Sequence, residues 1–308
     1  MVTASAPGKF ILLGEHAVVY GKPAVAIAID KRFACSVRHD TENSLNGRPV
    51  AFDKHPYIYH MLQKHAVGPV AVDTVSDIPA GSGLGSSAAL SVSFSAAIRA
   101  MNDMPIYGNE VAEDAFDTEY GVQGRASPLD TSACTNGRGI IVNGISSDDH
   151  LWSISRNDNI WDVSNMEVPD MTFVVGYTGL HAPTGPLVER VRKYREKNGF
   201  AYDIVNEIGD ITLAGIDAMK KDDIVKLGEL MTYDHKLLSI LGVSCKELNK
   251  LVDSTLPYSY GAKLTGSGGG GSMIALTDKP EEVCDAITKR GGRPFIVRTN
   301  VKGVTVSK

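Results

Sequence analysis

Two glycine-rich segments constrain the fold of this chain more than any other sequence feature. The first, PAGSGLGSSAA, occupies residues 79–89, and the second, KLTGSGGGG, occupies residues 263–271. Glycine readily adopts positive φ and lets another group approach the backbone closely, at an entropic cost when the loop is ordered. The first segment lies between an expected strand (70–75) and an apolar expected helix (88–101). The second lies between two expected strands (262–265 and 272–277).

The first segment is suited to binding a phosphate. A helix that starts after a strand leaves free N–H groups and a positive dipole end, which attract anions. No lysine follows Gly85, so the segment is not a P-loop, and its glycine spacing does not match the dinucleotide fingerprint. The alternative is a serine-capped turn without a ligand. For the second segment the alternative is a flexible linker, but its position between apolar strands favours a loop that closes over a ligand near the first.

The order of elements predicts two α/β layers rather than a helix bundle. The first half is rich in expected strands and the second half in expected helices. The segment 146–169 is polar and carries both tryptophans. We place a domain boundary within it, near Asn165, which gives domains at residues 1–165 and 166–308. The helices of the second half are expected at residues 187–197, 202–219, 222–238, 245–254 and 281–290.

Composition excludes several classes of protein. Lys and Arg total 31 against 36 Asp and Glu, a net charge of −5, which disfavours nucleic-acid binding through general charge. No apolar run approaches the ~18 residues of a membrane span, and Lys9 and Glu15 interrupt any signal-peptide core. The four cysteines are scattered, with no C-x-x-C pair, which fits a reducing compartment. We expect a cytoplasmic protein without membrane or nucleic-acid partners.

Three segments together resemble a known family. They are residues 6–23, with APGK and GEHAVVYGKP, and the two glycine-rich segments, in this order along the whole chain. This resembles the GHMP superfamily of small-molecule kinases, and GEHAVVYG looks like its mevalonate kinases. The resemblance implies an N-terminal domain like domain 2 of ribosomal protein S5, with a left-handed βαβ crossover, and a ferredoxin-like C-terminal domain. It also implies ATP and Mg²⁺ as cofactors, mevalonate as the small-molecule substrate, and a homodimer.

The resemblance assigns the nucleotide and metal sites. Ser87 matches the family serine that helps to ligate Mg²⁺, and Glu119 matches the metal carboxylate; oxygen ligands of this kind suit Mg²⁺. A solvated helix residue is the alternative for Glu119. The residues expected to bind ATP are Pro79, Ala80, Gly81, Ser82, Gly83, Leu84, Gly85, Ser86, Ser87, Ala88, Ala89, Gly268 and Gly269.

The resemblance also assigns catalytic residues. Asp130 matches the catalytic aspartate, although the segment reads ASPLD where the family has a PSGVD type of segment. Lys9 matches the lysine that keeps this aspartate ionised and offsets charge on the transferring group. Both residues are expected to contact substrate. A helix N-cap is the alternative for Asp130, and an exposed lysine for Lys9.

Further substrate contacts are expected from both halves of the chain. Glu15 and His16 match residues that contact mevalonate in the family, and Thr184 aligns with a threonine at the substrate site. Arg192 and Arg195 are candidates for the cation that pairs with the substrate carboxylate. For at least one of them, a solvated helix face is the better interpretation.

The implied activity is ATP-dependent phosphorylation of (R)-mevalonate to 5-phosphomevalonate, in the mevalonate route of isoprenoid biosynthesis. The alternatives are another GHMP kinase (a mevalonate 3-kinase, a phosphomevalonate kinase or an archaeal shikimate kinase) and a non-catalytic nucleotide or metabolite sensor. Lys9, Ser87, Glu119 and Asp130 are all present, which favours an enzyme over a sensor.

Overall fold

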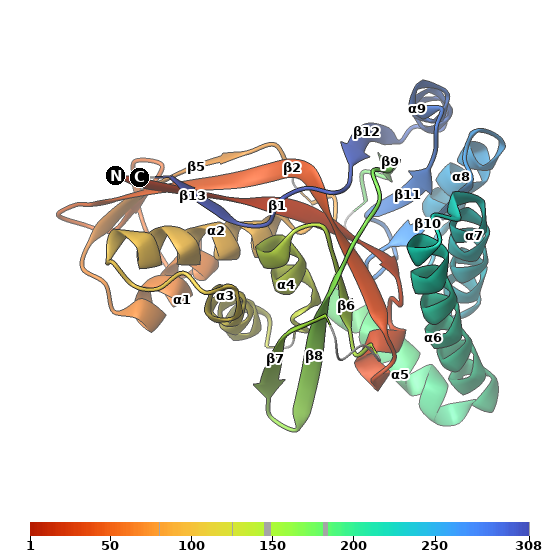
Figure 1. Cartoon of the computed structure of the whole chain (residues 1–308), viewed down its shortest axis with the longest axis horizontal. Helices are drawn as coiled ribbons and strands as arrows, with labels where there is room; N and C mark the ends of the chain where they lie inside the picture. Colours follow the sequence, from red (N-terminus) through yellow and green to blue (C-terminus); the bar gives the residue numbers. More distant parts are fainter. Residues whose placement is uncertain (80, 125, 145–148, 181–183, 308) are drawn as a thin grey trace.

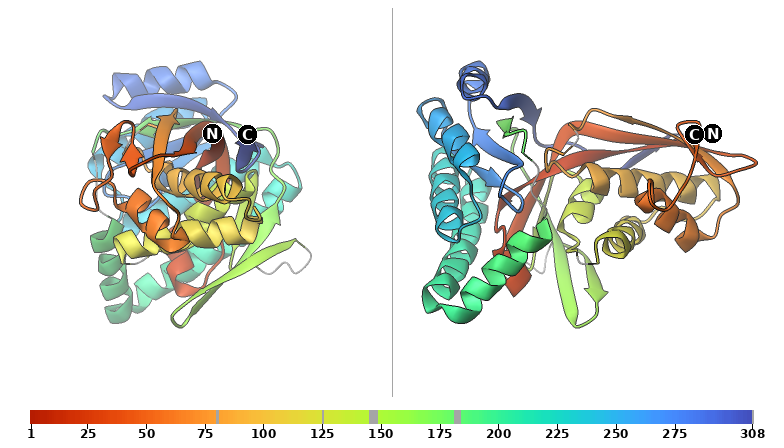
Figure 2. Two further views of the ribbon diagram at one scale, coloured as in Figure 1. Left: turned by 90° about the vertical axis from the view of Figure 1, so that its left-hand side faces the viewer. Right: turned by 180° about the vertical axis from the view of Figure 1, so that it is seen from behind.

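The computed structural model has two sheets side by side, each with its own helices (Figure 1). It describes residues 1–79, 81–124, 126–144, 149–180 and 184–307. The first half of the chain forms the larger sheet, and the helix-rich second half packs around the smaller one (Figure 2). The expected α/β architecture is therefore confirmed.

The larger sheet is built on a long antiparallel pair, β1 (Val2–Leu13) and β2 (Ala24–His39). The buried residues of β2 are small or β-branched, which suits a pleated surface. The register shifts between Pro7 and Gly8, where proline cannot donate to the ladder. The other strands of this sheet are β3 (Ser44–Leu45), β4 (Arg48–Pro49), β5 (Val70–Ser76), β6 (Gly139–Val142), β7 (His150–Arg156), β8 (Asn159–Met166) and β13 (Thr305–Ser307).

Helices cover one face of this sheet (Figure 1). The apolar helix expected after the first glycine-rich segment is present as α2 (Ser86–Met101), which packs on β1 and β2. Most of its side chains are buried, as an Ala-rich sequence without a polar face requires. The other helices are the 3₁₀ turn η1 (Ala17–Tyr20), α1 (Pro56–His65), α3 (Gly108–Gln123) and α4 (Leu129–Asn136).

The smaller sheet has the ferredoxin-like topology that the resemblance implies. Its strands run β12-β9-β11-β10, all antiparallel, so that the order in sequence is 4-1-3-2 with helices in both crossovers. The strands are β9 (Thr172–Tyr177), β10 (Gly261–Thr265), β11 (Ser272–Leu276) and β12 (Arg293–Arg298). The helices are α5 (Thr184–Lys197), α6 (Gly199–Lys220), α7 (Ile224–Ile240), α8 (Lys246–Thr255), η2 (Leu256–Tyr258) and α9 (Pro280–Lys289).

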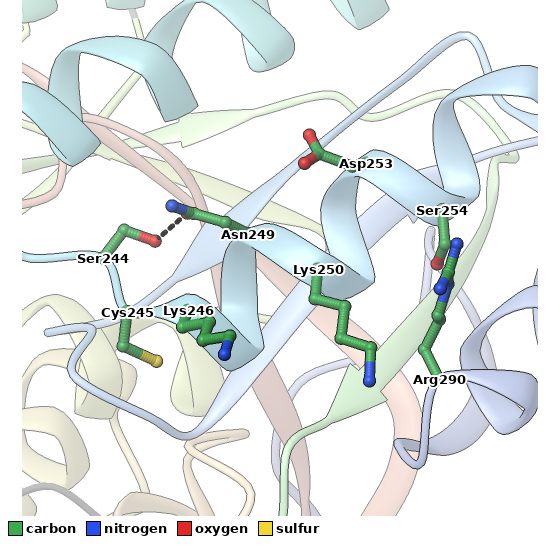
Figure 3. A pocket seen from close by; sticks show the side chains of 8 residues that line it. All are labelled: Ser244, Cys245, Lys246, Asn249, Lys250, Asp253, Ser254 and Arg290. Carbon is green, nitrogen blue, oxygen red and sulfur yellow. Dashed lines mark hydrogen bonds between the residues drawn. The ribbon is translucent and has the colours of Figure 1, made fainter.

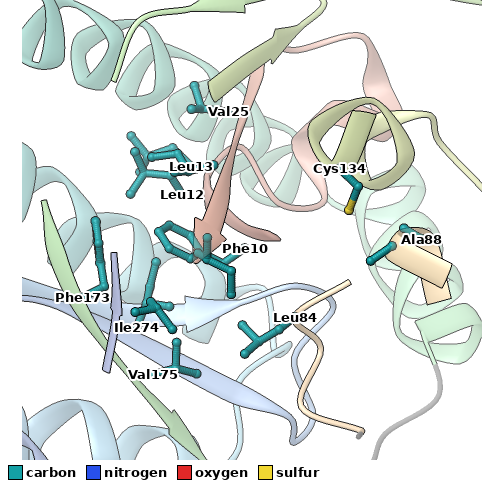
Figure 4. Packing of buried hydrophobic residues seen from close by; sticks show 14 of the residues in the cluster. Phe10, Leu12, Leu13, Val25, Leu84, Ala88, Cys134, Phe173, Val175 and Ile274 are labelled. Atoms are coloured by element: carbon teal, nitrogen blue, oxygen red, sulfur yellow. The ribbon is translucent and has the colours of Figure 1, made fainter. Parts of the chain in front are cut away.

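One apolar core joins the two sheets. Phe10 of β1 and Phe173 of β9 are both fully buried, with ring centroids 4.8 Å apart. Leu84 of the first glycine-rich segment and Ile274 of β11 belong to the same cluster (Figure 4). Because both sheets contribute to this core, the segments between them are held in fixed positions relative to one another.

Three parts of the chain differ from the sequence-based expectation. The polar segment 146–169 contains the β7–β8 hairpin, whose charged and polar residues lie on an exposed edge. Asp130 lies in the first turn of α4 rather than at the helix N-cap, which was its alternative interpretation. The C-terminal segment returns to the larger sheet, where β13 pairs with β1. The division at residues 165 and 166 stays a prediction, and β13 crosses it.

No helix among the described residues is long and apolar enough to cross a membrane.

Candidate active site

Lys9 and Asp130 lie together at the centre of the candidate site. Lys9 Nζ is 2.8 Å from Asp130 Oδ2, and the lysine side chain is 3% exposed while that of Asp130 is 30% exposed. Lys9 lies on β1, and Asp130 lies in the first turn of α4, where a carboxylate interacts favourably with the helix dipole. The lysine is therefore not a surface residue, and the aspartate is not an N-cap, because Pro128 holds that position.

The first glycine-rich segment packs against this pair. The backbone N–H of Lys9 donates to the Leu84 carbonyl at 2.9 Å. Gly85 has φ +76°, and a Cβ there would lie 2.9 Å from Lys9 Cγ. Gly85 is also the N-cap of α2 and supplies no side-chain acceptor. The N–H groups of the first turn of α2 are thus left for a ligand, as anion binding at a helix N-terminus requires.

Glu119 is a buried carboxylate beside the pair. It lies on α3, and its Oε1 accepts from Gln123 Nε2 at 3.1 Å, whereas its Oε2 is buried without a partner among the described residues. Burial, followed by the negative charge of Asp130, raises the pKa of Glu119 to about 8. A buried carboxylate oxygen without a partner is a candidate cation ligand.

Glu119 and Ser87 fit a magnesium ion that is held mainly by phosphate oxygens. No cluster of three or more His, Cys, Asp or Glu residues able to bind a metal occurs in the described part of the chain. Mg²⁺ in phosphoryl-transfer sites commonly has one or two protein carboxylates, with nucleotide oxygens and water completing its coordination. Ser87 lies in the first turn of α2 and is partly exposed.

Glu15 and His16 form a tight turn after β1. His16 has φ +61° and ψ −38°, and the Ala17 N–H donates to the Glu15 carbonyl at 2.7 Å. This is a γ-turn with a non-glycine residue at its centre, a rare and strained conformation. His16 Nε2 lies 3.0 Å from the Ser267 carbonyl, while Nδ1 is buried with no partner among the described residues. Burial lowers the pKa of His16, so the ring is neutral at neutral pH.

Two functional candidates, Lys263 and Asp234, were not identified from the sequence. Lys263 of β10 is fully buried, forms an ion pair with Glu15, and lies 3.2 Å from Asp234 Oδ2. Glu15 is itself only 1% exposed, so its carboxylate faces Lys263. The KLTG motif marks Lys263 in the sequence, but nothing local indicates its partners, which lie on other elements.

The second glycine-rich segment lies beside the first, as expected. Ser272 Oγ donates to the Ser82 carbonyl at 2.6 Å, which joins the two segments directly. Gly268 has φ +80°, and a Cβ there would lie 2.0 Å from the Val243 carbonyl oxygen. The Gly269 N–H donates to that same oxygen at 2.7 Å. The segment is therefore packed into the domain rather than acting as a linker.

The remaining expected residues lie on or near α5. Thr184 is the first residue of α5, but its side chain lies outside the part of the molecule that the structure describes. The same holds for Ala80, one of the residues expected to bind ATP. Arg192 is exposed and pairs with Glu189 and Glu196. The Arg195 guanidinium lies 4.4 Å from the ring centroid of Tyr20. Arg190 was not considered from the sequence, yet its charge contributes to lowering the pKa of His16.

A separate basic hollow of about 710 Å³ lies along α8 (Figure 3). Ser244 Oγ donates to Asn249 Oδ1 at 2.5 Å in its wall. None of the residues around the Lys9–Asp130 pair lines it. Its lining residues are Ser244, Cys245, Lys246, Asn249, Lys250, Asp253, Ser254 and Arg290.

Comparison with known sequences decides the family. Residues 55–138 match the GHMP kinases N terminal domain, and residues 216–293 match the GHMP kinases C terminal domain. A mevalonate kinase of Pyrococcus furiosus is 34% identical, and the alignment covers 100% of this chain and 98% of that protein. One from Methanothermobacter thermautotrophicus is also 34% identical, over 98% of this chain and 99% of that protein. The chain belongs to the mevalonate kinase family of GHMP kinases.

Solved structures of this family have the same fold. The Methanococcus jannaschii mevalonate kinase aligns with a TM-score of 0.78 at 26% identity, covering 98% of each chain. A structure of L. major mevalonate kinase in complex with R-mevalonate aligns with a TM-score of 0.81 at 24% identity, over 97% of this chain and 96% of that one. A Streptococcus pneumoniae phosphomevalonate kinase aligns with a TM-score of 0.79 at only 15% identity, over 97% of this chain and 100% of that one. The fold is thus shared by kinases that act on different substrates.

Proposed function

We propose that this kinase transfers the γ-phosphoryl group of ATP to the C5 hydroxyl of (R)-mevalonate. The observation that carries the proposal is the Lys9–Asp130 pair at 2.8 Å, beside the buried Glu119 and the open N-terminus of α2. A P–O bond to ADP breaks and a P–O bond to the C5 oxygen forms, while the hydroxyl proton leaves that oxygen. Full-length similarity to mevalonate kinases supports the choice of substrate.

Asp130 would accept the hydroxyl proton or orient the hydroxyl for attack. Its side chain is partly exposed, whereas Lys9 is buried behind it. The Lys9 ammonium is paired with this carboxylate and would offset negative charge on the transferring group. Phosphoryl transfer depends mainly on positioning and charge neutralisation, and this pair supplies both.

The first glycine-rich segment would bind the ATP phosphates. Gly81, Gly83 and Gly85 all have positive φ, and successive backbone N–H groups in such conformations form an anion-binding concavity. Gly268 and Gly269 would close over the nucleotide from the second segment. Glu119 and Ser87 would hold Mg²⁺, which neutralises phosphate charge when bound.

His16 would bind a hydroxyl group of mevalonate. Because a carbonyl oxygen only accepts, the 3.0 Å contact with Ser267 places the ring proton on Nε2. Nδ1 of the neutral ring is then an acceptor without a protein partner among the described residues. Arg190 is the proposed cation for the substrate carboxylate, because its charge acts on His16, whereas Arg192 is engaged by Glu189 and Glu196. Thr184 and Glu15 stay proposed substrate-site residues.

A coupled ADP-release assay tests the substrate. Mevalonate, 5-phosphomevalonate and shikimate are offered separately with MgATP, and the product is examined by ³¹P and ¹³C NMR. We expect turnover with mevalonate alone and phosphate on C5. Phosphate on C3, or turnover with another alcohol only, would overturn the proposed substrate or position of transfer but would leave the proposed role of the Lys9–Asp130 pair untouched. ATP binding without any turnover would instead indicate a sensor.

Homodimerisation and a cytoplasmic location are further proposals that follow from the family resemblance. Sedimentation velocity at micromolar concentration tests the first, and a mass of one chain would exclude a stable dimer.

A further inference from the structure

The turn at His16 holds a strained conformation at the candidate substrate site. A histidine with φ +61° and ψ −38° lies outside the regions that L-residues favour. Such residues persist only where the surrounding structure over-determines them, and they cluster at functional sites. Something in the molecule must therefore hold this turn against relaxation.

The side chains of the first residue of the turn, Glu15, and of its central residue, His16, are anchored to the second half of the chain. Glu15 is ion-paired with Lys263 of β10, and His16 is bonded to the Ser267 carbonyl just after that strand. Before the turn, the Thr265 hydroxyl donates to the Ile11 carbonyl at 2.9 Å and accepts from the Ile11 N–H at 3.0 Å. The strained turn is thus fastened to one short stretch of β10 and the loop that follows.

Lys263 is in turn held by Asp234 of α7. Lys263 and Asp234 are fully buried, and Glu15 is 1% exposed. Two carboxylates share one cation in this cluster, and burial raises the pKa of both Glu15 and Asp234. Replacing such a cluster with apolar residues is often neutral for stability, so stability alone does not explain its presence.

We propose that Lys263 and Asp234 are positioning residues that hold the strained turn and so present His16 Nδ1 to the substrate. This rests on the proposed function of His16. The competing interpretation is a purely structural ion cluster that joins the two sheets and has no specific effect on His16.

A double-mutant cycle separates the two interpretations. Lys263→Met removes the cation but leaves the buried carboxylates of Glu15 and Asp234. The second variant, Lys263→Met/Asp234→Leu, therefore removes Lys263 and one of its two carboxylate partners together. We expect either to lower kcat/KM for mevalonate by about 10- to 100-fold, as for a misplaced contact group, with the KM for ATP within about twofold. In a His16→Ala background the same change should alter kcat/KM by less than about twofold, because coupled residues are not additive.

Asp114→Asn is the matched control. Asp114 is also a buried carboxylate held by cations, including Arg99 at 2.7 Å, but it lies on α3. Its effect on kcat/KM should be the same with His16 or Ala at position 16. Equal, additive effects of the Lys263 variants in both backgrounds would overturn the proposal.

Histidine NMR gives a readout that does not depend on turnover. The His16 imidazole signals are assigned by their loss in His16→Ala. We expect them to show a proton on Nε2 in the unsubstituted kinase, and to shift in the Lys263 variants but not in Asp114→Asn. Unchanged His16 signals in both Lys263 variants would overturn the proposal, whereas absence of mevalonate turnover with shifted signals would overturn only the substrate assignment.

Discussion

At the scale of single residues, the site combines groups whose environments give them different tasks. Asp130 is partly exposed and forms an ion pair with the buried Lys9, so its carboxylate is accessible from solvent. Glu119 is buried beside it, and its pKa is raised to about 8. A metal ion would compensate the burial of Glu119. Two carboxylates of nearly the same chemistry thus lie in different environments, which suit the proposed role of Asp130 as proton acceptor and that of Glu119 as metal ligand.

Asp130→Asn should lower kcat for mevalonate by about 10²- to 10⁴-fold, the usual range for loss of a general base. The amide keeps the shape of the side chain but cannot accept the proton or attract Lys9 strongly. ATP affinity, measured by calorimetry, should stay within about twofold. An unchanged kcat would remove Asp130 from the reaction.

Glu15→Gln should change how stability depends on pH. Burial raises the pKa of Glu15 from 4.5 to about 7, so the folded state binds more protons than the unfolded state between these values. The stabilising contribution of Glu15 to the free energy of unfolding is fully present below pH ~4.5 and is lost as pH rises toward 7.

Urea unfolding across this pH range is the measurement. Between pH 4.5 and 7, the slope of the free energy of unfolding against pH should differ between the two proteins by up to one proton, because only the unsubstituted kinase has the Glu15 titration, which lowers its stability as pH rises. Parallel pH profiles for the two proteins would show that Glu15 does not titrate in this range.

At the scale of elements, the close packing of Gly85 links the first glycine-rich segment to Lys9. Gly83 and Gly85 both have φ +76°, but the surroundings of their missing side chains differ. A Cβ at Gly83 meets nothing within 4 Å, whereas one at Gly85 would press on Lys9. The loop therefore positions the lysine as well as offering its own N–H groups.

Gly85→Ala and Gly83→Ala form a matched pair. Each introduces backbone strain of about 1 kcal/mol, from a residue with a Cβ at positive φ. Only Gly85→Ala should also displace Lys9, so its kcat should be about tenfold lower than that of Gly83→Ala. Steady-state kinetics with saturating MgATP is the measurement, and equal kcat values for the two variants would contradict a positioning role of the loop.

At the scale of the whole molecule, the C-terminal segment completes the larger sheet. Arg32 of β2 donates to the carbonyls of Ser5, Lys302 and Gly303 at 2.7–2.9 Å. Gly303 is packed so closely that a Cβ would lie 2.0 Å from the Thr135 carbonyl oxygen. Residues at the two ends of the chain thus lie side by side (Figure 1).

Arg32→Met should lower the free energy of unfolding by about 1.5–3 kcal/mol, the range for hydrogen bonds to a charged group. It should also speed hydrogen exchange of the backbone amides of β13, because the hydrogen bonds from Arg32 to Lys302 and Gly303 hold the segment just before this strand. Arg138→Met is the control, because its ion pair with Glu167 is exposed and such pairs contribute about 0–1 kcal/mol. Equal losses of stability in the two variants would show that Arg32 does not tether the tail.

Much of the architecture was predictable because its signals are local. The apolar run after Gly85 predicted α2, and the spacing of apolar residues predicted the helices of the second half. The β7–β8 hairpin was missed because both strands carry many exposed polar side chains and β7 lies at the edge of the sheet, so the alternation of apolar and polar residues is weak. The strand β13 was missed because it is short and its partner is almost the whole chain away.

The sequence by itself determined the family and the two glycine-rich loops, because each belongs to a contiguous motif. The roles of Lys9, Glu119 and Asp130 are predictions that the resemblance to the family implies. The tertiary structure alone decided which charges meet: Glu15, Asp234 and Lys263 come from three distant segments and share one buried site. It also decided that Arg192 is engaged elsewhere while Arg190 influences His16. The physical reason is that motifs and helical periods act over a few residues, whereas buried charge pairing depends on how separate elements pack.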